Sequence, residues 1–195
     1  MVLDAERGDL RSAAGDAELV RRAQSGDESA FGELVDRHGN ELYGLAYFLT
    51  GQASDAEDVV QETFLGAYEG LKAFESRSSI RTWLRRILVK QAARHQRSKR
   101  VRKAVQPMDL SAASKALLGG AAMKDTAISN EIRMDVLEVL QTLSPDHKEI
   151  VVLRELDGLS YTEIADVLGI AEGTVESRLF RARQELKVLL KDYLD

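Results

Sequence analysis

The sequence contains no cysteine and only two prolines among its 195 residues. The absence of cysteine excludes disulfides, thiolate metal sites and thiol switches within this chain. No run of apolar residues is long enough to span a bilayer, and this excludes a transmembrane helix. Residues 1–18 are polar and acidic, so they match neither a signal peptide nor a transit peptide. Together, these absences predict a soluble cytoplasmic protein with no membrane contact of its own.

Strand patterns are also missing, because no stretch of useful length alternates apolar and polar residues. Apolar residues instead recur at helical spacing along most of the chain. We therefore predict an all-α fold of two helical domains joined by a flexible linker. The expected segments are a disordered lead-in, a first domain, a linker with two adjacent glycines and a second domain, at residues 1–16, 17–103, 104–127 and 128–195.

Capping residues predict where several helices begin. Asp27 is expected to cap one helix, and Ser54, with Glu57 three residues later, to form a capping box for the next. Ser144 precedes Pro145, a residue that suits the first position of a helix. The apolar face of the helix that follows Ser54 is expected to consist of Val59, Val60, Phe64, Leu65 and Tyr68.

Residues 156–190 have the pattern of a helix-turn-helix. Ser160 and Glu163 form a capping box at the start of a first helix, and Gly169 stands where that helix must stop and reverse. A longer helix begins near Glu172, with one apolar face and with hydroxyl and arginine side chains on its other faces. This arrangement is typical of a helix that enters the DNA major groove. An ordinary pair of antiparallel helices with a solvated arginine face is the alternative, because such patterns have false positives.

A stretch of high positive charge lies at residues 81–103, which carry ten Lys or Arg side chains and no acidic residue, although the whole chain has a net charge of −5. Ten neighbouring cations repel each other unless a polyanion is present, so nucleic acid is the favoured partner, bound in a salt-dependent way. A solvated helix surface and an anionic membrane are the alternatives. Membrane binding requires a continuous apolar face, but here that face is needed for the core of the domain.

Three acidic residues, Asp55, Asp58 and Glu62, share one face of a predicted helix, with Gln61 beside them. A metal or acid–base site would need converging ligands, and no histidine stands three or four residues from any of the three. The histidines of the chain are scattered among polar neighbours, and no nucleophile–base pair can be assembled. We therefore predict no catalytic residue, no metal site and no cofactor, and thus a protein that is not an enzyme. The acidic face is then either a solvated surface or a docking site for a basic partner.

Three separate motifs follow one another along nearly the whole chain: DAEDVVQETFLGAYEGLKAF, TWLRRI and LRELDGLSYTEIADVLGIAEGTVESRLFRARQEL. In this order they resemble the extracytoplasmic-function (ECF) sigma factors of bacterial RNA polymerase. The resemblance implies a sigma region 2 domain followed by a sigma region 4 domain. It implies an alternative sigma factor that directs the polymerase to specific promoters, melting the −10 element with the first domain and recognising the −35 element with the second. The implied partners are core RNA polymerase, through the β′ clamp helices and the β subunit, promoter DNA and an anti-sigma factor.

The resemblance and the helix pattern also assign roles to individual residues. Core polymerase is expected to bind Asp55, Asp58, Gln61 and Glu62. The −10 DNA is expected to contact Arg77, Ser79, Trp83, Arg86, Lys90, Arg94 and Arg97. The −35 duplex is expected to contact Arg154, Thr174, Glu176, Ser177, Arg178, Phe180, Arg181 and Arg183. The loop at residues 72–80 is implied to capture a flipped base of the −10 element.

Three positions depart from the family pattern. Lys90 stands where many relatives have an asparagine, Glu176 where they often have a basic residue, and Ala171 where they offer a serine or proline. The departures at Lys90 and Glu176 affect which promoter sequence is expected, and not the class of function. The departure at Ala171 removes a helix cap worth about 1 kcal/mol. A stand-alone helix-turn-helix repressor is the alternative function. Such a repressor would need neither the acidic face nor the basic helix of the first domain.

Overall fold

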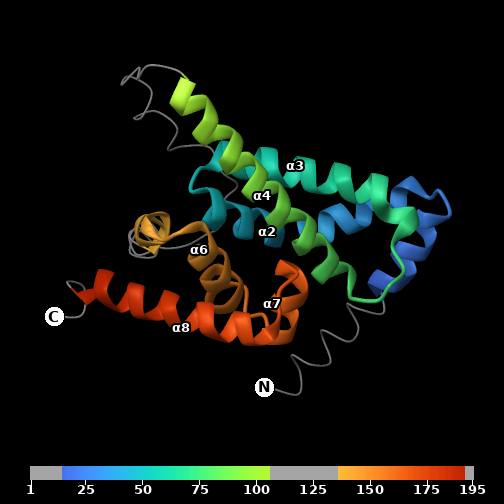
Figure 1. The fold of residues 1–195 in the computed structure, drawn as a ribbon. Coiled ribbons are helices and arrows are strands. Elements are labelled where there is room, and N and C mark those ends of the chain that lie inside the picture. Colours follow the sequence, from blue (N-terminus) through green and yellow to red (C-terminus); the bar gives the residue numbers. More distant parts are fainter. Residues whose placement is uncertain (1–14, 106–135, 192–195) are drawn as a thin grey trace, which may run out of the picture.

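The computed structural model describes residues 15–105 and 136–191, which form helices and short connecting turns (Figure 1). The first domain consists of a helix at residues 15–24, α2 (Glu28–Thr50), α3 (Ala53–Gly70), the 3-10 helix η1 (Leu71–Ala73) and α4 (Ile80–Val105). The second domain consists of a helix at residues 136–142, α6 (Pro145–Val151), the π-helix η2 (Val152–Leu156), α7 (Tyr161–Leu168) and α8 (Glu172–Leu189). The described residues contain no strand, so the predicted all-α class is confirmed.

Most of the predicted lead-in and linker lies outside the described residues. Residues 15 and 16, which we placed in the lead-in, begin the first helix, and residues 104 and 105, which we placed in the linker, end α4. Asp16 is buried, and its carboxylate pairs with Arg37 of α2 and lies 3.1 Å from a ring nitrogen of His38. None of the helices in the described residues has the length and apolarity that crossing a membrane requires.

Cap residues set several of the helix ends. The Asp27 side chain accepts a hydrogen bond from the Ala30 N–H, and the Ser144 hydroxyl accepts one from the His147 N–H, so both predicted caps are confirmed. α2 ends at Gly51, whose φ of 81° is a left-handed conformation that glycine adopts without strain. These local signals explain why α2 and α6 occupy the positions that the sequence indicates.

The predicted capping box of Ser54 and Glu57 is wrong. Ser54 is already inside α3, whose N-cap is Gln52, and the Gln52 side chain makes no capping hydrogen bond. A tertiary contact fixes this end of the helix instead, because Asp55 in its first turn pairs with Lys99 of α4 at 2.6 Å. The pairing between helices thus overrides the local capping signal.

The core of the first domain lies where α2, α3 and α4 meet. Its most buried side chains include Leu34, Leu49, Val59 and Leu88. On α3, Val59 and Phe64 are buried as predicted, whereas Leu65 and Tyr68 are 61% and 51% exposed, so their predicted inward direction is wrong. α3 packs against α2 and α4 but leaves its third face to solvent. Leu65 lies on that face, and Tyr68 lies at its edge, where its ring contacts that of Phe31 in α2 at 5.1 Å between centroids.

The two domains pack against each other. α7 lies against α4, η2 lies against α2, and the buried residues of both domains form one continuous apolar cluster. α8 packs on α6 and α7, and in Figure 1 it runs below them. The most buried side chains of the second domain include Ile150, Leu153, Ile164, Val175 and Leu179.

Candidate nucleic-acid and polymerase interface

The helix-turn-helix is formed by α7 and α8. The Ser160 hydroxyl accepts a hydrogen bond from the Glu163 N–H at 3.2 Å, and the Glu163 carboxylate accepts one from the Ser160 N–H at 2.8 Å, so the predicted capping box is present. Burial acts to raise the pKa of Glu163, but the hydrogen bonds from Ser160 lower it below its ordinary value. α7 ends at Gly169, whose φ of 67° reverses the chain. α8 begins at Glu172 after Ala171, which makes no side-chain cap.

Three of the predicted −35 contacts on α8 are exposed and form no polar contact with the described residues: Glu176, Phe180 and Arg181. The Phe180 ring is 63% exposed, which is unusual for a large apolar side chain. Thr174 and Ser177 are half-buried, and the Ser177 hydroxyl donates to the Thr174 carbonyl at 3.1 Å. The outer face of α8 therefore presents a carboxylate, an aromatic ring and a guanidinium to solvent.

The other predicted −35 arginines are held by groups of their own domain. Arg178 lies 3.3 Å from the carboxylate of Asp146, and Arg183 lies 2.6 Å from that of Glu155. Arg154 donates to a backbone carbonyl at 2.7 Å and lies over the ring of the first residue of α7. Exposed ion pairs contribute at most about 1 kcal/mol, so a DNA phosphate can replace these carboxylates.

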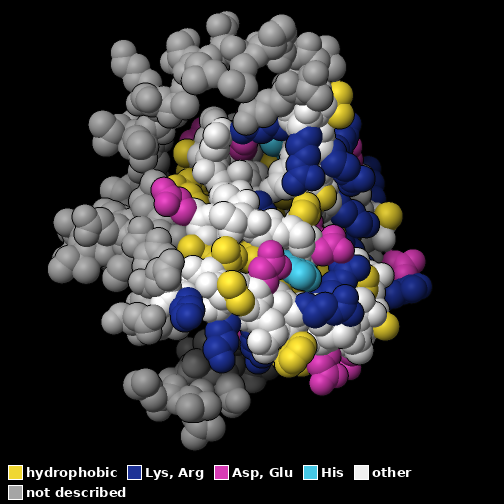
Figure 2. All heavy atoms as spheres, turned by 60° about the vertical axis from the view of Figure 1, so that its left-hand side comes forward, with side chains coloured by type: hydrophobic (Ala, Val, Ile, Leu, Met, Phe, Trp, Pro, Cys, Tyr) yellow, Lys and Arg dark blue, Asp and Glu magenta, His cyan; other side chains and the backbone are white. Residues whose placement is uncertain are grey.

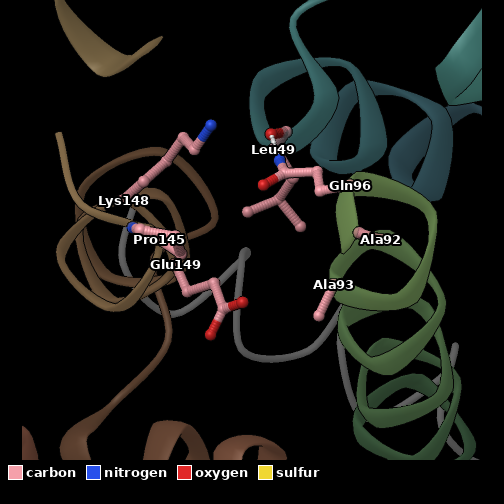
Figure 3. A pocket seen from close by; sticks show the side chains of 7 residues that line it. All are labelled: Leu49, Ala92, Ala93, Gln96, Pro145, Lys148 and Glu149. Atoms are coloured by element: carbon pink, nitrogen blue, oxygen red, sulfur yellow. Dashed lines mark hydrogen bonds between the residues drawn. The ribbon is translucent and has the colours of Figure 1, made fainter. Parts of the chain in front are cut away.

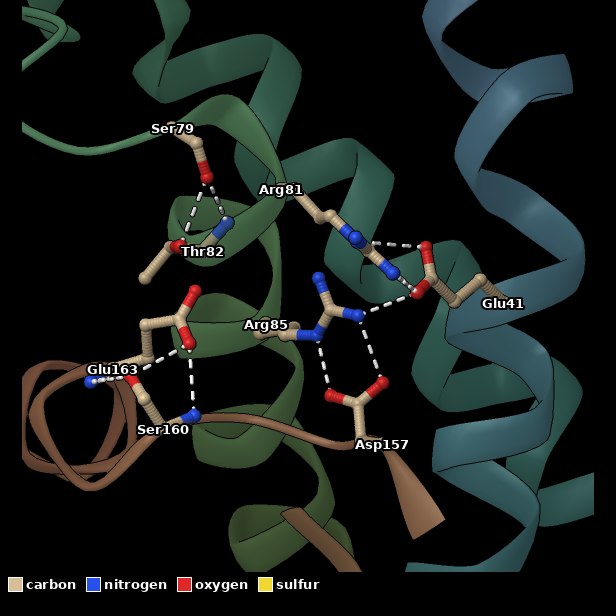
Figure 4. Close-up of polar contacts among 8 residues, drawn as sticks. All are labelled: Glu41, Ser79, Arg81, Thr82, Arg85, Asp157, Ser160 and Glu163. Carbon is tan, nitrogen blue, oxygen red and sulfur yellow. Dashed lines mark hydrogen bonds and ion pairs between the residues drawn. The ribbon is translucent and has the colours of Figure 1, made fainter. Parts of the chain in front are cut away.

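The loop before α4 positions the first of the predicted −10 contacts. The Ser79 hydroxyl accepts a hydrogen bond from the Thr82 N–H at 3.0 Å and so caps the first turn of α4 (Figure 4). The half-buried ring of Trp83 lies 4.9 Å from the ring of Phe74, measured between centroids. Arg77 is exposed and pairs with a neighbouring acid of the loop. The loop thus brings aromatic and cationic side chains to one end of the first domain.

The remaining −10 candidates lie along α4 and divide into two groups. Lys90, Arg94 and Arg97 are exposed, and Figure 2 shows Lys and Arg side chains gathered in the upper part of the molecule, where α4 ends. Arg86 instead donates to the backbone carbonyl of Asp166 in α7 at 3.0 Å. In the packed arrangement of the domains, Lys90, Arg94 and Arg97 are therefore accessible while Arg86 is engaged.

The predicted polymerase face of α3 is formed only in part. Asp55 has a side chain that is only 14% exposed, and it pairs with Lys99 at 2.6 Å and with His95 at 3.2 Å, both from α4. The exposed members of the predicted face are Asp58, Gln61 and Glu62. Among the residues that the structure describes, no group of three or more His, Asp or Glu side chains could hold a metal ion.

The sequence reasoning missed two apolar members of this face. Leu65 and Tyr68 follow the exposed acids at helical spacing and are themselves exposed. Beside them, between α2 and α3, lies a groove of about 560 Å³ lined by Val35, Gly39, Asn40, Tyr43, Glu57, Val60, Gln61 and Phe64. An acidic rim around apolar side chains suits a basic amphipathic helix. The width of the apolar stripe on α3 could have indicated these two residues, because it exceeds the width of one buried helix face.

A small hollow lies at the seam between the two domains (Figure 3). Its walls are Leu49, Ala92, Ala93 and Gln96 from the first domain and Pro145, Lys148 and Glu149 from α6. Burial and the nearby charge of Asp146 raise the pKa of Glu149 to about 7. Burial also lowers the pKa of Lys148, whose ammonium group donates to the Gln141 side chain at 2.8 Å.

Comparison with known proteins assigns the chain to a family. The family model for Sigma-70 region 2 matches residues 34–102, and that for Sigma-70 region 4 matches residues 133–186. The ECF RNA polymerase sigma-E factor of Salmonella typhimurium is 38% identical over 178 residues, which cover 88% of this chain and 92% of that protein.

Two solved structures are similar as well. CnrH, in complex with the cytosolic domain of CnrY, is 30% identical with a TM-score of 0.68 over 91% of this chain and 98% of its own. The sigma factor RpoE of Bartonella quintana, in complex with the anti-sigma factor NepR, is 29% identical with a TM-score of 0.63 over 83% and 96%. These relatives give no support to a stand-alone repressor. The chain therefore belongs to the ECF sigma factors, the alternative sigma factors that direct RNA polymerase to promoters.

Proposed function

We propose that the chain initiates transcription by holding the melted −10 strand on its first domain, residues 15–105, and the −35 duplex on its second domain, residues 128–195. The observation that carries the proposal is the outer face of α8, which is exposed beside a tight turn. A helix presented in this way suits the major groove of duplex DNA. The proposed −35 contacts on that face are Glu176, Phe180 and Arg181.

The −10 element is proposed to lie along α4 and the loop before it. The exposed cations there suit the backbone of a single strand, and the Trp83 ring suits stacking on a base, which is worth about 1–3 kcal/mol. The cations proposed to bind the strand are Lys90, Arg94 and Arg97. Arg86 joins them only after α7 has moved away, because its guanidinium is now bonded to that helix.

The outer face of α3 is proposed to dock on the β′ clamp helices of core polymerase. Asp58 and Glu62 supply negative charge, and Leu65 and Tyr68 supply exposed apolar surface at the centre. Interfaces of this kind gain most of their affinity from central aromatic or apolar anchors and their orientation from charges at the rim. Asp55 has a different role, since its carboxylate holds α3 to α4.

Sigma factors of this family contribute binding to transcription initiation, and we infer that this chain has no catalytic activity and works in the cytoplasm beside the polymerase. The similarity to RpoE in complex with NepR supports an anti-sigma factor as a further partner. The second domain is proposed to contact the β subunit.

Run-off transcription with core polymerase and a promoter library tests the proposed function. We expect initiation from a defined subset of promoters, and a loss of at least about tenfold in the Arg181→Ala variant, because a good base contact is worth about 1–3 kcal/mol. Lys187→Ala is the matched control, since Lys187 is also an exposed cation of α8 but lies nearly two turns further on. Absence of specific initiation, together with duplex binding that needs no polymerase, would contradict the proposal and favour a repressor.

A further inference from the structure

A buried charge cluster joins the two domains. Arg85, in the second turn of α4, is completely buried. Its guanidinium forms a two-point contact with Asp157, which ends η2 in the second domain, at 2.5 Å (Nε to Oδ2) and 2.8 Å (NH2 to Oδ1). The same guanidinium donates to Glu41 of α2 at 2.5 Å, and Glu41 also pairs with Arg81 (Figure 4). Arg85 of α4 is therefore neutralised by one carboxylate from each domain.

Two further polar contacts cross the same seam. Arg86, next to Arg85, donates to the backbone carbonyl of Asp166 in α7 at 3.0 Å. At the other end of the seam, the Gln141 amide donates to the backbone carbonyl of Phe48 in α2 at 3.2 Å. The domains are thus held in one relative position by directional contacts as well as by apolar packing.

A promoter requires the two DNA-binding surfaces to be far apart. The −35 and −10 elements lie about 25 base pairs apart, which is about 85 Å of duplex at 3.4 Å per base pair. A compact chain of this length has a radius of gyration of about 16 Å and so a diameter of roughly 45 Å. Since α7 of the helix-turn-helix lies against α4, the packed arrangement does not reach both elements.

We propose that the Arg85–Asp157 ion pair is an interdomain latch that keeps the free protein closed, and that the latch opens when the chain binds polymerase and promoter. Only the opening of the latch on binding polymerase and promoter rests on the proposed function. Opening frees Arg86 for DNA and separates α7 from α4. The length of the connecting segment permits this separation of the domains, because the 30 residues from 106 to 135 span about 100 Å when extended.

The chemistry of the cluster makes the latch breakable. Arg–carboxylate pairs with two parallel hydrogen bonds are strong and geometrically specific. However, the NH1 nitrogen of Arg85 is buried and has no hydrogen-bond partner among the described residues. Opening hydrates this nitrogen and both charges, so hydration offsets part of the attraction that is lost. A partner that binds the open form with moderate preference is then sufficient to shift the population.

Single-molecule energy transfer tests the latch. Because the chain contains no cysteine, the exposed positions Ala17→Cys in the first domain and Gln184→Cys on α8 can each be labelled with a dye. We expect high energy transfer in the free, doubly labelled protein that carries no further substitution. In the Asp157→Asn variant, the open population should rise by roughly tenfold to a hundredfold, because the charged two-point contact between the domains is lost while Glu41 still neutralises Arg85 within the first domain.

Glu155→Gln is the matched control, because it removes an exposed ion pair that lies inside the second domain, only two residues from Asp157. Transfer in this variant should stay high. Circular dichroism should show unchanged helix content in Asp157→Asn, and if that variant does not fold, Arg85→Met replaces it with the same expected loss of transfer. Low transfer in the free protein, or unchanged transfer in folded variants of the latch, would overturn the proposal.

The second half of the proposal is tested on initiating complexes with core polymerase and promoter DNA. Transfer there should fall to the value of the opened variant. High transfer in complexes that produce transcript would overturn release of the latch. Absence of any transcript would instead contradict the proposed function, while the measurement on the free protein still decides whether the latch exists.

Discussion

Asp55 of α3 lies 2.6 Å from Lys99 of α4 and thereby joins two helices of the first domain. A carboxylate in this position is turned toward its own domain, although it lies only one turn from the exposed Asp58. The acidic residues of α3 therefore divide into one that stabilises the fold and others that are available to a partner. In the sequence, Asp55 has the same charge as the exposed acids of α3 and shares their helical spacing, so only the contacts in the structure distinguish it from them.

Reversing the charge of Asp58 is expected to weaken binding to core polymerase. Asp58→Lys places a cation on the face proposed to dock on a basic partner, where juxtaposed like charges are unfavourable. The free energy of unfolding should change by only about 0.5 kcal/mol, because the residue is exposed. Fluorescence anisotropy with labelled sigma factor and core polymerase measures the affinity.

Asp55→Asn is the companion variant, with the opposite pattern. Its free energy of unfolding should fall by about 1 kcal/mol, because a partly buried ion pair is lost. Its affinity for core polymerase should change less than that of Asp58→Lys. Equal affinities of Asp58→Lys and the unchanged protein would contradict the docking face on α3.

The exposed cations of α4 are expected to control formation of the open promoter complex. Replacing both Arg94 and Arg97 with Ala removes two phosphate contacts, so the dependence of log K on log salt should become shallower by about 1 for each contact. The loss of single-strand affinity should consequently be largest at low salt. Permanganate footprinting across a salt series reports the melting, and Arg21→Ala, which removes an exposed cation of the first helix, should leave it unchanged.

Glu176 is expected to read a base of the −35 element. An exposed carboxylate on the recognition helix repels phosphate, but it can accept a hydrogen bond from the N4 amino group of cytosine. The competing idea that Glu176 positions an arginine lacks support in the structure, because Arg178 pairs with Asp146 and Arg181 makes no ion pair with the described residues.

A −35 library selected with the unchanged protein and with Glu176→Ala decides this point. The variant should lose preference at one position, by roughly 1–3 kcal/mol. Glu172→Ala removes the same charge one turn earlier and should alter overall affinity without changing the preferred bases. Identical base preferences for Glu176→Ala and the unchanged protein would exclude direct readout.

Local signals were sufficient to predict the helix-turn-helix. The capping box at Ser160, the left-handed Gly169 and the missing cap at Ala171 all depend on residues within one or two turns of each other. The caps at Asp27 and Ser144 were predictable for the same reason. Each of these features follows from backbone hydrogen bonding at helix ends.

Contacts between distant segments were not predictable in this way. The basic stretch at residues 81–103 predicts one uniform cationic surface. Within this stretch, however, Arg85 is completely buried and contacts Asp157, a residue 72 positions away. Likewise, the apolar pattern of α3 could not show that Leu65 and Tyr68 lie on an open face. Which residues of a helix are covered depends on where the other helices pack, and the periodicity of one helix does not contain that information.

Protonation of Glu149 is expected to make the stability of the protein depend on pH. Burial at the seam, together with the charge of Asp146, raises the pKa of Glu149 from its ordinary value of 4.5 to about 7. Between these two values the folded chain holds the proton more tightly than the unfolded chain, so stability decreases as the pH rises from about 4.5 to about 7. Above that window, the cost of a buried charge is fully present.

The Glu149→Gln variant removes this titration while it keeps the size of the side chain. At pH 8 we expect the variant to be more stable than the unchanged protein by about 1 kcal/mol, a value reduced for the partial exposure of the carboxyl group, and near pH 4.5 the two should be almost equal. Urea denaturation at a series of pH values measures the difference. Glu138→Gln is the control for the loss of one exposed carboxylate from the same domain. A constant difference between Glu149→Gln and the unchanged protein across the series would show that the carboxyl group at the seam titrates normally.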